Sequence, residues 1–240
     1  DDLPARIALM HKPRRHICAM SDTEGRDTVA RYLPDDLHGC RHVGRLDFNT
    51  TGLLLWTNAR RLHRLLLDPR SHLPRIYRVK VRDRIDPDDH RLRLLASGTI
   101  DLDGTPALPC PVTFETLRTR ATWIRITLTE GRFRQIRRMC AAVGFQIVKL
   151  ERHAIGRLTL PEDLTPRCIR TAETSELHDL FAPWLEQLDA PLPFTWDDLA
   201  HGHVTTRTLE RWLHNTQQQL WTSADEAEPS GTPLDLHDEA

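Results

Sequence analysis

One stretch of this sequence constrains its fold more than any other, VGRLDFNTTGLLLWTN from Val43 to Asn58. It passes through Asp47 and a Thr-Thr-Gly turn, then enters the apolar run Leu53 to Trp56, which has the length of a buried strand. Because rigid backbone holds Asp47 just before a core element, its carboxylate can be presented to a cleft. The alternative is an aspartate that only caps its own turn, which is common for this residue type.

The same stretch partly matches a calcium-binding loop. Its first, third, fifth and sixth positions are Asp47, Asn49, Thr51 and Gly52. The fifth position is a threonine, however, and Asn58 stands at the twelfth, where calcium needs a bidentate glutamate. No amphipathic helix precedes the loop, so we expect no metal here.

The charge of the chain is divided between its two parts, although the formal net charge is −1. Residues 1–160 carry 29 Lys and Arg against 18 Asp and Glu, a net charge of +11. Residues 161–240 carry 4 against 16, a net charge of −12. A basic domain predicts a polyanionic partner, because arginines that neutralise phosphates release counterions. The alternative is basic charge that only solvates the surface.

The cysteines and the hydropathy pattern indicate the compartment. The five cysteines are odd in number and lack C-x-x-C spacing, so we expect reduced, buried thiols. No apolar stretch has the length of a membrane span, and the N-terminus lacks the apolar core of a signal peptide. We expect a cytoplasmic protein with no membrane partner.

Periodicity predicts a mixture of strands and helices. We expect strands at Ile7–Met10, Arg75–Arg82, Pro111–Leu117, Thr122–Leu128 and Gln146–Leu150, and helices at Asn58–Leu67 and from Gly131 to Gly144. In the strand RIYRVKVR, Tyr77, Val79 and Val81 alternate with basic residues, which predicts one buried and one wet face.

The helix expected from Gly131 to Gly144 places one arginine in an unusual position. Its apolar arc contains Phe133, Ile136, Met139, Cys140 and Val143. Arg134 and Arg138 face water, whereas Arg137 lies about 40° from Phe133, at the margin of the arc. A partly desolvated arginine either pairs with a carboxylate or extends to the surface, and both alternatives are open at this point.

The character of the chain changes after Pro166. Apolar residues keep helical spacing despite Pro183, at Leu177, Leu180, Phe181, Trp184, Leu185 and Leu188, and a second amphipathic segment spans Thr206–Leu220. We therefore expect an acidic helical C-terminal extension over residues 171–222 and a disordered tail over residues 223–240. A helix-turn-helix is the alternative, but the acidic setting favours a small packing element.

Three segments, taken together, resemble the pseudouridine synthases, and specifically their RsuA-like branch, which acts on ribosomal RNA. They are GRLDFNTTGLLLWTN (Gly44–Asn58), RIYRVKV (Arg75–Val81) and EGRFRQIRRMCAAVGFQIVKLERHAIGRLTL (Glu130–Leu160). Lys12-Pro13 falls where the family has an N-K-P element. The three segments follow in the family's order over most of the basic part of the chain, so the match is specific.

The resemblance implies an α+β pseudouridine synthase fold, with a central, mostly antiparallel sheet flanked by helices. Residues 1–170 would form the catalytic domain, followed by the helical extension, and we expect the branch's small N-terminal S4 domain to be absent. The implied activity is isomerisation of a specific uridine in ribosomal RNA to pseudouridine, without metal or cofactor. We expect a monomer whose partner is ribosomal RNA, alone or in a ribosomal subunit or assembly intermediate.

The resemblance also implies roles for single residues. Asp47 takes the position of the aspartate that attacks the nucleoside, Tyr77 that of the tyrosine stacked on the uracil, and Arg137 that of the basic residue paired with the aspartate. Contacts with RNA are expected from Arg45, Lys12, Arg134, Arg138 and Arg75. The rival function is a non-catalytic RNA-binding or ribosome-assembly module that kept the fold. The intact catalytic residues favour an enzyme.

Overall fold

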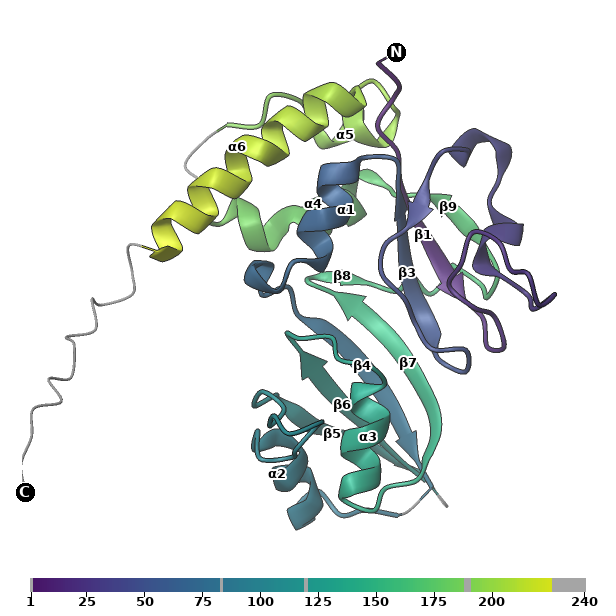
Figure 1. Ribbon diagram of the computed structural model, residues 1–240, viewed down its shortest axis with the longest axis vertical. Helices are drawn as coiled ribbons and strands as arrows, with labels where there is room; N and C mark the ends of the chain where they lie inside the picture. Colours follow the sequence, from purple (N-terminus) through teal and green to yellow (C-terminus); the bar gives the residue numbers. More distant parts are fainter. Residues whose placement is uncertain (1, 83, 119–120, 188–190, 226–240) are drawn as a thin grey trace, which may run out of the picture.

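The computed structural model describes residues 2–82, 84–118, 121–187 and 191–225 (Figure 1). Its strands are β1 (Ile7–Lys12), β2 (Arg41–His42), β3 (Thr51–Thr57), β4 (Arg75–Val81), β5 (Val112–Arg118), β6 (Ala121–Leu128), β7 (Ile147–Ile155), β8 (Leu158–Thr159) and β9 (Ile169–Thr171). They form one sheet in the order β5-β6-β4-β7-β3-β1-β9, with β2 on β3 and β8 on β7. Every pairing is antiparallel except β3–β7, which confirms the predicted mostly antiparallel sheet.

The helices flank this sheet, and the α+β class is confirmed. They are α1 (Arg60–Leu67), α2 (His90–Ala96), α3 (Gln135–Ala142), α4 (Thr174–Leu185), α5 (Trp196–Ala200) and α6 (Thr206–Asp225), with short 3-10 turns at Val29–Tyr32, Asp35–Leu37 and Pro69–Ser71. Figure 1 shows α2 and α3 beside the central sheet part, β4 to β7, and α1, α4, α5 and α6 beside the N-terminal sheet part, β1, β2, β3 and β9.

Strand β4 follows the alternation of its sequence. Val79 and Val81 are fully buried in a core with Ile124 and Ile126 of β6, whereas Arg78 lies on the other face. There its Nε donates to the carboxylate of Glu115 on β5, at 2.9 Å. The predicted wet, basic face of this strand is therefore confirmed, and α2 and α3 cover the apolar one.

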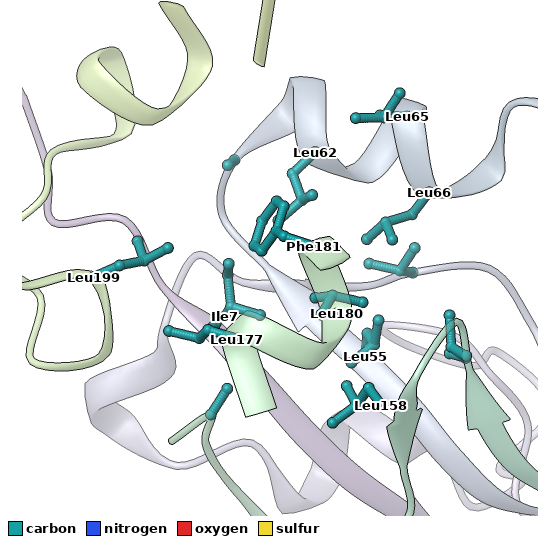
Figure 2. Packing of buried hydrophobic residues seen from close by; sticks show 14 of the residues in the cluster. Ile7, Leu55, Leu62, Leu65, Leu66, Leu158, Leu177, Leu180, Phe181 and Leu199 are labelled. Atoms are coloured by element: carbon teal, nitrogen blue, oxygen red, sulfur yellow. The ribbon is translucent and has the colours of Figure 1, made fainter. Parts of the chain in front are cut away.

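Strand β3 is buried along its whole length because both of its faces are covered. One core contains Leu53 and Leu55 together with residues of α1 and α4, and Figure 2 shows Phe181 of α4 beside Leu62 of α1. A separate core holds the other face of β3 under the chain between residues 29 and 40. This two-sided burial explains the continuous apolar run in the sequence.

The two parts of the sheet join through a short parallel contact between β3 and β7. The register pairs Thr51 with Glu151 and Gly52 with Arg152. Gly52 has a φ of +111°, and a Cβ built on it would lie 2.2 Å from the carbonyl oxygen of Arg152. Only glycine allows this approach, so the Thr-Thr-Gly turn fixes where the Asp47 loop meets β7.

The C-terminal helices belong to the same core as the N-terminal sheet part. Leu199 of α5 and Leu209 and Leu213 of α6 are buried in it, as expected if this segment is a small element that packs on the domain. Glu210 of α6 accepts the backbone N–H of Arg60 at 2.7 Å, at the start of α1. The domain boundary predicted at residue 170 falls inside β9, and the division into domains stays a prediction.

Three expectations need correction or fall outside the described residues. Helix α6 runs to Asp225, so a disordered tail from residue 223 is wrong at its start, and residues 226–240 lie outside the described chain. Leu188, expected on a helix, is also outside it. Cys168 is exposed and Cys18 is only half-buried, so not all thiols are buried. In the part of the chain that the structure covers, no helix has the length and apolarity of a membrane span.

The close approach at Gly52 gives a stability test. We expect Gly52→Ala to lower the free energy of unfolding by about 3 kcal/mol or more, because the new methyl group overlaps the Arg152 backbone in addition to the cost of a positive φ. The matched control is Gly39→Ala, since Gly39 has a φ of +91° with nothing within 4 Å of its Cβ position. This control should cost only about 1 to 2 kcal/mol. Equal losses in urea denaturation of the two variants would contradict the account.

Candidate active site

A cleft of about 590 Å³ opens where the two parts of the sheet meet. Its walls come from the loop from Gly44 to Thr50, from β4, from the turn before α3 together with the first residues of α3, and from β7. This volume lies within the range of roughly 300–1,000 Å³ that is usual for small-ligand sites. The cleft is therefore large enough for a single nucleotide.

Asp47 and Arg137 meet in the wall of this cleft. The Nε of Arg137 donates to Oδ2 of Asp47 at 3.3 Å, and its Nη2 donates to Oγ1 of Thr50 at 3.1 Å. The N–H of Thr50 donates to the backbone carbonyl of Asp47 at 2.9 Å, which closes the loop into a tight turn. Both charged side chains remain partly accessible, at 26% for Asp47 and 20% for Arg137. Of the two alternatives for Arg137, pairing with a carboxylate is confirmed.

Tyr77 lies on β4 and lines the same cleft. It is half-buried and packs against the core of the central sheet part, yet it also lines the cleft. Because β4 is an inner strand between β6 and β7, the position of the tyrosine is fixed on both sides. Tyr77 therefore belongs both to the edge of this core and to the lining of the cleft.

Two cations line the inner wall of the cleft and have no acidic partner among the residues that the structure describes. Arg75 of β4 donates from Nη2 to the carbonyl oxygen of Leu66 at 2.9 Å, and burial followed by the nearby charge of Arg152 lowers its pKa. Arg152 of β7 is only 4% exposed, and its Nε donates to the carbonyl oxygen of Leu53 at 2.8 Å. Its buried Nη2 has no hydrogen-bond partner among the described residues. A buried donor of this kind calls for an acceptor, which a bound ligand can supply.

Arg152 was not among the predicted site residues. Its signal in the sequence is its place in LERHAIG, part of the third segment that carries the family resemblance. Alternation along β7 alone does not identify it, because its neighbour Glu151 is also buried. Its place in the cleft comes from strand pairing, with Gly52 of β3 on one side and Tyr77 of β4 on the other.

Lys12 does not face the cleft, which corrects the prediction that it contacts RNA. It is fully buried, and its Nζ donates to the carbonyl oxygens of Pro13 at 2.9 Å, Thr50 at 2.9 Å and Phe48 at 3.4 Å. Phe48 and Thr50 follow Asp47 in the same loop, so the ammonium group holds the loop that presents this carboxylate. Burial lowers the pKa of Lys12 to about 8, against the opposing effect of Cys18 and Asp47.

Helix α3 begins later than the sequence predicted. Its first residue is Gln135, and Arg134 before it has a positive φ of 49°. Phe133 is 73% exposed and is not on the apolar arc, which is a further correction. The left-handed residue brings Nη1 of Arg134 to 3.9 Å from Oδ2 of Asp47. Arg134 therefore lines the cleft and does not face outward from a regular helix.

The remaining predicted RNA contacts divide into two groups. Arg45 is exposed and lines the cleft, as Arg75 and Arg134 do. Arg138 does not line the cleft and forms a two-fold ion pair with Asp103, at 2.7 and 2.9 Å. Contact between these arginines and RNA stays a prediction. Within the described chain, no group of three or more His, Cys, Asp or Glu side chains is arranged to hold a metal ion.

Comparison with known proteins identifies the family. A family model described as RNA pseudouridylate synthase matches residues 6–142. Ribosomal large subunit pseudouridine synthase B of Escherichia coli (strain K12) is 39% identical over 181 residues, covering 73% of this chain and 60% of that protein. Ribosomal small subunit pseudouridine synthase A of Yersinia pestis is 32% identical and covers 75% of this chain and 74% of that protein.

A solved structure agrees with these sequence matches. A crystal structure described as pseudouridylate synthase superimposes with a TM-score of 0.65 at 27% identity, covering 74% of both chains. The chain belongs to the RNA pseudouridylate synthase family, and its resemblance to the RsuA-like branch is confirmed. It spans between 49% and 61% of the length of the large-subunit relatives from Yersinia pestis and Shigella flexneri.

The burial of Lys12 gives a test by pH. The folded protein loses this proton near pH 8, whereas the unfolded chain keeps it to its ordinary pKa of 10.5, so the unfolded state binds more protons in that window. The contribution of Lys12 to stability should therefore rise with pH between about 8 and 10.5, by up to about 1.4 kcal/mol per pH unit.

The measurement is the difference in unfolding free energy between the wild type and Lys12→Met, followed by urea denaturation across pH. The contributions of all other titrating groups cancel in this difference, so what remains is the pH dependence that Lys12 itself contributes. A flat difference across the window, or one that falls as pH rises, would show that the pKa of Lys12 is not depressed.

Proposed function

We propose that this protein isomerises a specific uridine of ribosomal RNA to pseudouridine. The observation that carries the proposal is the Asp47 carboxylate, held by Arg137 in the wall of a nucleotide-sized cleft. The names of its relatives include synthases of both ribosomal subunits, which supports ribosomal RNA as the substrate class.

The reaction needs few protein groups. It breaks the bond between N1 and C1′, forms a bond between C5 and C1′, and exchanges the hydrogen on C5 for one on N1. No other reactant is consumed, so a carboxylate beside the sugar and a pocket that retains the detached base suffice. Asp47 is assigned as the group that attacks the nucleoside.

The other lining residues would position the substrate. Arg137 orients the carboxylate, because its guanidinium is also fixed by Thr50. Tyr77 offers a ring face to the uracil. Arg75 and Arg152 present guanidinium donors in the inner wall. Acceptor oxygens of the nucleotide would satisfy the Nη2 of Arg152, which has no partner among the described residues.

The RNA must deliver its uridine unstacked, because the carboxylate lies inside a cleft that a base paired in a helix does not enter. Arg45 and Arg134, which are exposed on the cleft wall, would contact the backbone of the strand. We propose a cytoplasmic monomer that acts on ribosomal RNA, alone or in a ribosomal subunit or assembly intermediate. Residues 1–170 would form its catalytic domain.

Replacement of the carboxylate tests this proposal. We expect Asp47→Asn to lower pseudouridine formation by about 10⁴-fold or more, since the group that attacks is lost, and to leave RNA binding nearly intact. The measurement is chemical mapping of pseudouridine in both ribosomal RNAs from a strain that lacks the protein and is resupplied with each variant.

The matched control is Asp88→Asn, because Asp88 is exposed and its side chain has no described partner. It should restore the modified position as the wild type does. If Asp47→Asn also restores it, the assigned mechanism is wrong. If the wild type itself restores no position while still binding RNA, the non-catalytic RNA-binding module is the better account.

A further inference from the structure

A second hollow of about 400 Å³ lies beside the cleft and shares one residue with it, Phe48. Four arginines line this arginine hollow, Arg14, Arg15, Arg26 and Arg167. None of them was singled out as a site residue from the sequence, and none lines the cleft itself. The hollow brings together two segments that are about 150 residues apart in the chain, which the N-terminal sheet part makes neighbours.

Most of the positive charge in the hollow is not neutralised by acidic residues of the described chain. Arg26 is paired with Asp22 at 2.7 Å and with Glu24 at 3.0 Å. Asp27, the only acidic residue that lines the hollow among those described, is taken up by an ion pair with Arg31. The side chains of the other three arginines, Arg14, Arg15 and Arg167, form no ion pair with a described residue and are exposed. The hollow thus retains a free positive charge that suits an anion.

The backbone beneath these arginines is held in an uncommon conformation. Arg15 has a φ of 62° and Arg167 a φ of 79°, two of the five residues other than glycine with positive φ in the described chain. The N–H of Arg15 donates to the carbonyl oxygen of Phe48 at 2.7 Å, and that of Arg167 donates to His11 at 2.9 Å. Strained backbone of this kind persists where its surroundings fix it, and it gathers at ligand sites.

The backbone of Arg14, the third unpaired arginine, is also held in place. His16 is buried, and its ring contacts the carbonyl oxygen of Arg14 through Nδ1 and the hydroxyl of Tyr32 through Nε2, both at 2.8 Å. The ridge between the hollow and the cleft is Phe48, which follows Asp47 directly and is 41% exposed. An exposed aromatic ring beside a basic hollow is the arrangement on which unpaired RNA bases stack.

We propose that the arginine hollow binds phosphodiester groups of the RNA strand next to the target uridine, and that the neighbouring base stacks on Phe48. This inference rests on the proposed function for the occupant of the cleft. Since Phe48 borders both hollows, a strand whose uridine enters the cleft passes its next nucleotides over the unpaired arginines. Phosphate groups then supply the negative charge that the described acidic residues do not provide for these arginines.

The test is the salt dependence of RNA binding by the double variant Arg14→Ala/Arg167→Ala. The double variant and the protein it is compared with both carry Asp47→Asn, so that the RNA is not converted. The probe is a short single-stranded oligouridine. Loss of two phosphate contacts should reduce the slope of the logarithm of affinity against the logarithm of salt concentration by about 1.4, at about 0.7 per contact.

Two further variants separate this site from general surface charge. Arg207→Ala/Arg211→Ala removes the same charge from exposed positions on α6 and should leave the slope unchanged. Arg14→Lys/Arg167→Lys keeps the charge and should keep the slope. An unchanged slope in the first double variant, or an equal loss in the α6 control, would overturn the proposal. Neither outcome depends on pseudouridine formation, whose absence in the wild type would instead contradict the proposed function.

Discussion

The ion pair between Asp47 and Arg137 is the interaction on which the rest of this structure depends. Its partners are 90 residues apart, one in the loop before β3 and the other on α3. They meet because β3 and β7 join the two parts of the sheet through a contact only two residue pairs long. Gly52 permits that contact, and Lys12 holds the loop from beneath, so the carboxylate stands on backbone that is fixed from both directions.

The cleft also depends on helices α4, α5 and α6, none of whose described residues line it. Leu67 at the end of α1 and Pro69 just after it line the cleft, while the apolar stripe of α1 packs in the core that α4, α5 and α6 complete (Figure 2). Glu210 of α6 accepts N–H groups that the first turn of α1 leaves free. The C-terminal helices thus support one rim of the site.

Much of the fold could be predicted from local pattern, because strands such as β4 and helices such as α1 carry their own periodicity. The position of Arg137 at the margin of an apolar arc predicted either a carboxylate partner or extension to the surface, and the structure shows the partner. The features that the sequence did not predict depend on tertiary structure. Arg134 takes a left-handed conformation, so α3 begins later than expected, and Lys12 is buried under backbone carbonyls. Arg152 reaches the cleft through the pairing of β7 with β3 and β4. No periodicity encodes such contacts.

The most direct test of the central claim is the single-turnover rate of pseudouridine formation by Arg137→Gln, with enzyme in excess over unmodified ribosomal RNA. Release of the C5 hydrogen from labelled uridine reports the rate, and the dissociation constant for the RNA is measured alongside it. If the guanidinium orients the attacking carboxylate, the rate falls by about 10²- to 10³-fold while RNA affinity is retained. A rate close to that of the wild type, in a folded variant that binds RNA normally, would contradict the account.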